Sequence, residues 1–155
     1  LYNLNYLYEK NGNKVCLTQQ SFTTLLGKIG DPPKPLPVPN QIFESLKDIN
    51  YDDYKIPDLE SMGVDLSKCG PCLYPGGETE SLRRLNEKLS NEAWVCNFEK
   101  PNTSPNSLQP STTVLSPYLK FGCLSARLFY YKLKEIYQKR KHTMPPVSLH
   151  GQLYW

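Results

Sequence analysis

The sequence has 155 residues, a formal net charge of +3 and 39% hydrophobic residues, so it is long enough to bury one sizeable core. No apolar run approaches the roughly 18–20 residues that a membrane-crossing helix needs, and no signal peptide is visible, which argues against a membrane protein. Five cysteines, an odd number, without a secretory context favour reduced intracellular thiols over a disulfide framework.

The charge is divided unevenly along the chain. Residues 1–77 carry seven Lys/Arg and nine Asp/Glu, whereas residues 78–155 carry eleven and six. Seven basic residues and one acidic residue, Glu135, lie between Lys120 and Lys141. Such a block suits a polyanion-binding surface, although a basic helix is more often simply a solvated face.

Residues 1–30 contain short apolar and tyrosine-rich stretches. Asn11 and Gly12 form a turn signal, and residues 21–27 could form one or two helical turns with Thr18 as the N-cap. Five prolines follow between Pro32 and Pro39, which predicts an extended polyproline-like spacer. A proline-rich docking ligand for another protein is the alternative interpretation of that spacer.

Residues 41–75 are mildly acidic and lack clear periodicity, apart from a short helix candidate over 41–47. We expect an interdomain linker here. Cys69-Gly70-Pro71-Cys72 spells the thioredoxin-type redox motif, whose chemistry requires a strand before the first cysteine and a helix that begins at it. Pro75 and two glycines soon follow and oppose that helix, and no second ligand pair supports zinc, so a loop is favoured.

The pattern changes after Thr79, where apolar residues recur at helical spacing. Leu82, Leu85 and Leu89 mark the buried face of the expected helix, and Trp94 and Phe98 could continue it. Such a stripe is more often core than part of a cofactor site.

Ser125 is expected to cap a longer helix over 126–139. Its inward side chains would be Phe129, Leu133, Ile136 and Tyr137. Ser148 would cap a final helix that has no C-terminal signal before the sequence ends, so we expect an internal fragment of a longer protein.

The segment 111–125 carries the most information. Four hydroxyls lie within six residues, and Ser116-Pro117 is typical of an N-cap followed by the first helical residue. A helix start attracts anions, and Lys120 would add charge one turn further on, so a phosphate or pyrophosphate is the natural ligand. A well-capped surface helix preceded by a polar loop is the alternative.

Several runs together resemble the cryptochrome/photolyase family, and within it the animal (6-4) photolyases most closely. The resemblance covers residues 76–155 closely and residues 1–40 loosely, and it does not extend to residues 41–75. The runs that carry it are residues 76–85, 97–103, 111–125, 145–149 and 151–155.

The resemblance implies a mainly α fold that contains the opening helices of the photolyase-type FAD-binding domain. Residues 1–30 would be the end of an N-terminal α/β antenna domain, residues 31–75 the interdomain linker, and residues 76–155 the truncated start of the FAD domain. The tryptophan relay, the lesion-site histidines and most of the FAD pocket would lie outside this sequence. We therefore expect the fragment alone neither to retain FAD nor to catalyse repair.

The resemblance also assigns roles to particular residues. Family contacts to the FAD phosphates and ribose fall on consecutive positions, some acting through hydroxyls and others through backbone N–H groups: Thr112, Thr113, Val114, Leu115 and Ser116. Lys100 matches a basic position near the FAD phosphates, although a solvated loop lysine is equally open. Gln152 matches the FAD and lesion pockets, and Trp155 matches the lesion pocket. No residue of the fragment is assigned as catalytic, His150 included, and no metal site is implied.

The implied activity of the parent protein is light-driven electron transfer from reduced FAD to a (6-4) photoproduct flipped out of damaged double-stranded DNA. The alternative is an animal-type cryptochrome that binds FAD and acts through clock proteins in circadian, blue-light signalling. Either protein would be nuclear or cytoplasmic, and the antenna pigment stays unassigned. A third reading, a nucleic-acid or proline-binding module without flavin, rests only on the basic block and the proline run.

Overall fold

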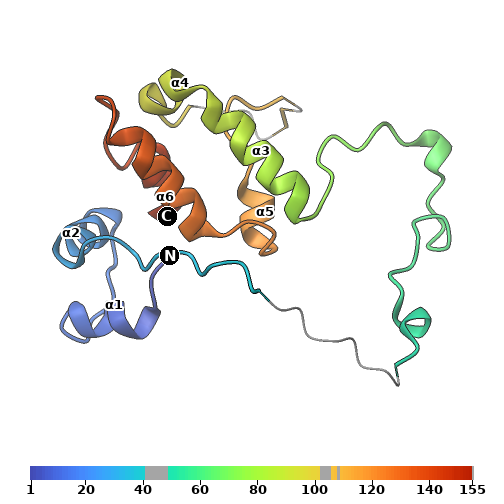
Figure 1. The fold of residues 1–155 in the computed structure, drawn as a ribbon, viewed down its shortest axis with the longest axis horizontal. Coiled ribbons are helices and arrows are strands. Elements are labelled where there is room, and N and C mark those ends of the chain that lie inside the picture. Colours follow the sequence, from blue (N-terminus) through green and yellow to red (C-terminus); the bar gives the residue numbers. More distant parts are fainter. Residues whose placement is uncertain (41–48, 102–105, 108, 155) are drawn as a thin grey trace. The chain divides into compact units, whose positions relative to one another are not determined.

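The computed structural model describes residues 1–40, 49–101, 106–107 and 109–154. The described residues are helical and contain no strand, which confirms the expectation of a mainly α fold (Figure 1). None of the described helices combines the length and the apolar character that crossing a bilayer requires. The described residues form seven α-helices: α1 (Leu4–Lys10), α2 (Gln19–Ile29), α3 (Glu78–Ser90), α4 (Glu92–Asn97), α5 (Ser116–Lys120), α6 (Ala126–Tyr137) and α7 (Leu149–Tyr154).

The described chain forms two compact units, Leu1–Pro35 with Gly76–Trp155, and Leu36–Pro75. In the first unit α6 packs against α3, α4 and α7. Leu85, Val95 and Leu133 are completely buried at the centre of this packing. The core of the molecule therefore lies in the second half of the sequence, where the helical periodicity predicts it.

Helix α3 begins after Gly77, whose φ of 99° is a backbone conformation that glycine adopts without strain. Glu80 pairs with Arg83 at 2.7 Å and with Arg84 at 2.6 Å, and these contacts connect successive turns of the helix. The apolar stripe does not continue unbroken beyond this helix. The Asn91 side chain accepts a hydrogen bond from the Trp94 N–H at 3.0 Å and begins the separate helix α4.

Helix α6 begins as predicted, because the Ser125 hydroxyl accepts a hydrogen bond from the Leu128 N–H at 3.2 Å. The predicted inward residues are all buried, but the helix ends at Tyr137, two residues before the predicted end. Tyr130 is also buried, which the sequence pattern did not indicate. Ser148 caps α7 as expected by accepting a hydrogen bond from the Gly151 N–H at 3.3 Å.

Residues 1–35 pack with the helices of the second half. The predicted helix at 21–27 is longer, spanning α2, and Thr18 forms its capping box with Ser21. Helix α1 was not predicted, since its residues show no clear stripe and none is buried. Asp31 attaches the segment to α6: one carboxylate oxygen accepts a hydrogen bond from the Tyr130 hydroxyl at 2.8 Å, and the other pairs with the Lys134 ammonium.

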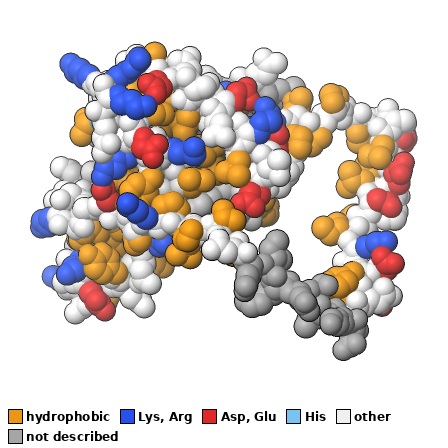
Figure 2. Space-filling model, viewed as in Figure 1, with side chains coloured by type: hydrophobic (Ala, Val, Ile, Leu, Met, Phe, Trp, Pro, Cys, Tyr) orange, Lys and Arg blue, Asp and Glu red, His pale blue; other side chains and the backbone are white. Residues whose placement is uncertain are grey.

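In the residues described, the second unit is irregular apart from two 3-10 turns, Tyr51–Tyr54 and Leu66–Lys68. Apolar side chains stand on its surface, among them Ile56, Leu36 and Val38 (Figure 2). The absence of periodicity predicts this lack of a core. The helix candidate at 41–47 lies outside the described residues.

Candidate functional site

The predicted anion-binding helix start has a different geometry from the one that its sequence suggests. Ser116 is the first residue of α5, Leu115 is the N-cap residue, and no side chain caps the helix. Leu115 takes the cap position because its side chain is buried in the core, which fixes where the helix begins. The prediction of Ser116 as N-cap is therefore wrong.

Helix α5 is also too short to act as the prediction required. It has five residues, and Lys120 lies in its last turn rather than beside its start. The chain leaves the helix through Gly122 with a φ of 72°. Because a macrodipole grows with the number of aligned peptides, a single short helix attracts an anion only weakly. Any anion binding must rest on the loop before the helix.

That loop contains an unusual backbone conformation at Val114. Its φ is 55°, a left-handed conformation that is rare for a β-branched residue and costs on the order of 1–3 kcal/mol. Leu115 and Tyr118 are buried immediately after it and hold the loop in place. Residues with a strained backbone of this kind cluster at ligand sites, where contacts with the surrounding structure hold them in the unfavourable conformation.

The polar groups of the loop face no protein partner within the described part of the chain. No hydrogen bond there involves the hydroxyls of Thr112, Thr113 or Ser116, and none is donated by the Val114 or Leu115 N–H. Both threonines are half-buried and Ser116 is exposed. The loop can therefore offer three hydroxyls and two amide donors to an anionic ligand.

Lys100 and Gln152, which lie 52 positions apart, line one cavity of about 290 Å³. Their approach has a clear cause, because the Lys100 N–H donates to the Val147 carbonyl at 3.0 Å, just before α7. The Thr143 hydroxyl donates to the Phe98 carbonyl at 2.6 Å and ties the same two segments together. The structure thus joins two predicted site residues in one cavity, and residues 112–116 are not among those that line it.

Gln19, the first residue of α2, lines the same cavity and was missed by the sequence analysis. It lies far from the residues that carry the resemblance, in a stretch whose only visible signal was the Thr18 cap. With Gln152 it gives the cavity two amides, each able to donate and to accept, beside the ammonium of Lys100. This combination suits a polar ligand that bears negative charge.

Gly151 forms part of the cavity wall and allows α7 to approach Pro146 closely. A Cβ atom at Gly151 would lie 2.2 Å from the Pro146 carbonyl oxygen and 2.5 Å from its carbonyl carbon. No side chain fits there without moving the backbone. Glycine at this position therefore sets the orientation of α7, and with it the position of Gln152.

His150, also in α7, does not line this cavity and instead packs against α6. Its Nε2 is 3.1 Å from the Tyr130 carbonyl oxygen, and its ring stacks on Tyr130 with the centroids 4.3 Å apart. Burial lowers the pKa of His150 below its usual value of 6.5, because the charged form loses its hydration. Trp155, the other predicted lesion contact, lies outside the described residues.

Some residues of the basic block between Lys120 and Lys141 form ion pairs with acidic residues of the same chain. Glu92 lies 3.1 Å from Lys139 and 3.7 Å from Arg140, and Lys134 pairs with Asp31. These contacts give the basic residues a structural role that does not need a nucleic acid. The polyanion surface consequently has fewer unpaired cations than the sequence suggests.

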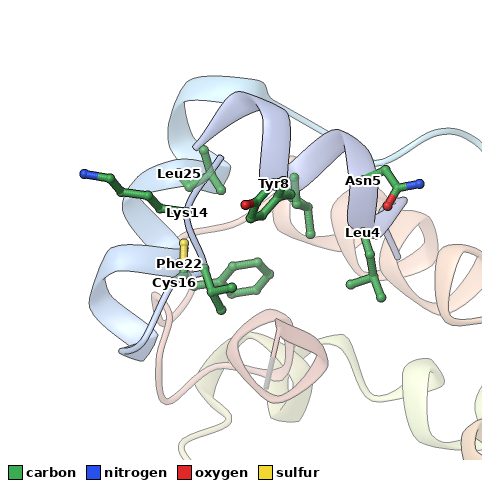
Figure 3. Close-up of a pocket in the computed structure, with 9 residues that line it drawn as sticks. Leu4, Asn5, Tyr8, Lys14, Cys16, Phe22 and Leu25 are labelled. Carbon is green, nitrogen blue, oxygen red and sulfur yellow. The ribbon is translucent and has the colours of Figure 1, made fainter. Parts of the chain in front are cut away.

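A second cavity, of about 410 Å³, lies between α1, residues 14–16 and α2 (Figure 3). Its lining is mainly apolar, with Leu4, Phe22 and Leu25 among the residues, and Lys14 extends away from it in the close-up. None of the residues predicted to bind FAD or DNA lines it. Among the described residues no group of three or more His, Cys, Asp or Glu side chains could hold a metal ion.

No protein-family model matches the chain. Comparison with individual proteins gives clear relatives along the whole of it. The chain is 47% identical to cryptochrome-2 of Gallus gallus, 44% identical to cryptochrome-1 of Mus musculus and 44% identical to cryptochrome-1 of Erithacus rubecula. Each alignment covers 100% of the chain and 28%, 27% and 26% of the respective relative. The chain belongs to the cryptochrome/photolyase family.

Family membership confirms the resemblance recognised in the motifs, and it extends that resemblance through residues 41–75, where the sequence analysis found none. The relatives are animal cryptochromes, so they favour the signalling alternative over (6-4) photolyase specificity. The chain spans little more than a quarter of their length.

Proposed function

We propose that the chain is a segment of an animal-type cryptochrome, an FAD protein that acts in blue-light or circadian signalling through protein partners such as clock proteins. The observation that carries this proposal is the identity of 44–47% to cryptochromes over the entire chain. The proposed protein works in the nucleus or the cytoplasm. Its FAD, once bound, supplies light absorption and electron transfer.

In this proposal the loop Thr112–Ser116 holds the FAD phosphates and ribose. The residues fit such a ligand: Val114 has the left-handed backbone, Leu115 anchors the loop in the core, and three hydroxyls have no described protein partner. Hydrogen bonds from several neutral donors to a diphosphate are charge-assisted, so each is stronger than a bond between neutral groups. The burial of Leu115 holds Val114 in its left-handed conformation before the ligand binds, so binding does not have to impose that conformation.

Lys100 and Gln152 form the second part of the proposed site. Both residues line the same cavity, which suits contacts to the cofactor or to a group that approaches it. Residues 1–30 would end the antenna domain, residues 31–75 would be the linker, and residues 76–155 would open the FAD domain. The packing of residues 1–35 with 76–155 means that the two proposed domain segments would share an interface.

Repair of (6-4) photoproducts in damaged double-stranded DNA is the second candidate. It is favoured by the shared cavity of Lys100 and Gln152. An amide can form hydrogen bonds with the polar edge of a pyrimidine, and a lysine can neutralise a phosphate. In this candidate the family's other lesion contact is Trp155, which lies outside the described residues. In this case the parent protein would be a light-dependent DNA lyase.

One experiment separates the two candidates. The complete protein is purified, its flavin is quantified by absorbance, and a short duplex with one (6-4) lesion is illuminated in its presence. We expect bound FAD and no restored pyrimidines. Restored pyrimidines that depend on light, and that decrease in Gln152→Ala but not in Gln20→Ala, would establish repair. A complete protein without flavin would contradict both candidates.

A further inference from the structure

Cys69 and Cys72 are the exposed cysteines of the described chain. Cys96 is buried, and Cys16 and Cys123 are half-buried. Cys69 and Cys72 lie three positions apart in the second unit, and neither is in a disulfide. Exposure and a neighbouring second thiol are two properties of cysteines that respond to oxidants, because the second thiol can resolve the first oxidation product.

The backbone around the pair is fixed on its N-terminal side. Asp65 accepts hydrogen bonds from the Ser67 N–H at 3.1 Å and pairs with Lys68 at 2.9 Å, which holds the 3-10 turn Leu66–Lys68. The Cys69 N–H donates to the Leu66 carbonyl at 3.1 Å and closes that turn. Cys69 thus emerges from an ordered turn with its thiol 3.6 Å from the Asp65 carbonyl.

The backbone at Gly70 and Cys72 has few constraints from hydrogen bonds or close contacts within the described chain. Cys69 is extended, with a ψ of 138°, and no described residue forms a backbone hydrogen bond with Gly70 or Cys72. A Cβ atom at Gly70 would meet nothing within 4 Å. A change of backbone conformation between Cys69 and Cys72 therefore breaks no backbone hydrogen bond of Gly70 or Cys72, and it can bring the two thiols together.

We propose that Cys69 and Cys72 form a reversible disulfide when a low-molecular-weight disulfide such as oxidised glutathione reacts with this segment. One thiol loses its proton to solvent and attacks oxidised glutathione, forming a mixed disulfide and releasing one reduced glutathione. The second thiol then loses its proton and attacks the protein sulfur of that mixed disulfide. The protein is oxidised by two electrons, and one oxidised glutathione becomes two reduced glutathiones.

Closing this ring changes the shape of the segment. The four residues from Cys69 to Cys72, if fully extended, separate the two end Cα atoms by about 10 Å, whereas a disulfide requires about 4.4–6.8 Å. The oxidised segment is accordingly shorter than a fully extended one. This reaction differs from thioredoxin catalysis, because no helix begins at Cys69 to activate its thiolate.

The test treats the reduced 155-residue chain with oxidised glutathione, followed by intact-mass analysis and tryptic mapping. We expect a mass lower by two hydrogens and an internal disulfide in the peptide 69–83, reversed by excess reduced glutathione. Cys16→Ser should give the same product. Cys72→Ser should instead retain one glutathione on Cys69, because the resolving thiol is gone.

Other products would overturn the proposal. These are stable glutathione adducts on both Cys69 and Cys72, or disulfides that link either residue to Cys16, Cys96, Cys123 or a second chain. A thiol-reactive dye supplies an independent readout. It should label Cys69 and Cys72 at least about ten times faster than Cys96 before oxidation, and label neither of them afterwards.

Discussion

The two compact units of this chain are stabilised in different ways. In the first, α6 buries one face against α3, α4 and α7, and Leu133 is completely inaccessible. In the second, the apolar residues that the structure describes remain on the surface, where Ile56 is 93% exposed. The comparison shows that the spacing of apolar residues, more than their number, decides whether a segment builds a core.

The largest expected effect is the difference in the free energy of unfolding between an apolar-to-alanine substitution in the first unit and one in the second. Leu133→Ala should lower the free energy of unfolding by about 2–5 kcal/mol, because it opens a cavity in the core that the neighbouring helices cannot fill. Ile56→Ala removes a similar volume from an exposed position and should change it by no more than about 0.5 kcal/mol. Urea unfolding followed by circular dichroism measures both. Equal losses in the two variants would show that the units do not differ as described.

A smaller effect tests the close approach of α7. Gly151→Ala should destabilise the first unit by about 1–3 kcal/mol, because the new Cβ would overlap the Pro146 carbonyl. Gly27→Ala is the matched control: a Cβ there meets nothing within 4 Å, and alanine should stabilise α2 by about 0.5–1 kcal/mol. The two variants should thus shift the urea midpoint in opposite directions. A neutral Gly151→Ala would refute the packing of α7 on Pro146.

The third effect depends on pH. Because burial lowers the pKa of His150, the unfolded chain binds a proton below pH 6.5 before the folded chain does. Folding stability should be fully present above pH 6.5 and fall by up to about 1.4 kcal/mol per pH unit as the pH drops from there to the folded pKa.

His150→Phe keeps a ring against Tyr130 and removes the titrating group, so its stability should decline less over the same pH range. Urea unfolding at several pH values between 7.5 and 5.5 measures the difference between the two proteins. Parallel pH profiles would show that His150 is not buried in its neutral form.

Much of the fold could be predicted from the sequence. Leucine spacing predicts α3, and apolar spacing together with the Ser125 cap predicts α6. Helix α1 could not be predicted, since it buries no residue and therefore shows no apolar stripe, although the Asn3 side chain caps its start. The apolar pattern also gives no signal for the break between α3 and α4, because that break depends on the Asn91 side chain accepting a hydrogen bond from the Trp94 N–H.

The sequence named candidate residues for the site but not their geometry. The motif resemblance named Lys100 and Gln152, yet their shared cavity depends on the Lys100–Val147 hydrogen bond, a pairing across 47 positions. The left-handed backbone of Val114 has no local signal, since the residue type disfavours it. The placement of Ser116 failed because burial of Leu115 overrides the usual preference for serine at an N-cap.

The most direct test of the proposed function is the FAD affinity of the complete protein with Thr112, Thr113 and Ser116 replaced by alanine. Loss of at least two hydrogen bonds to the diphosphate should weaken binding by about 100-fold or more, measured by flavin fluorescence. The control replaces the exposed hydroxyls of Ser61, Ser67 and Ser90 and should leave affinity within about threefold. If the Thr112, Thr113 and Ser116 variant binds FAD as tightly as the unsubstituted protein, residues 112–116 do not hold the cofactor.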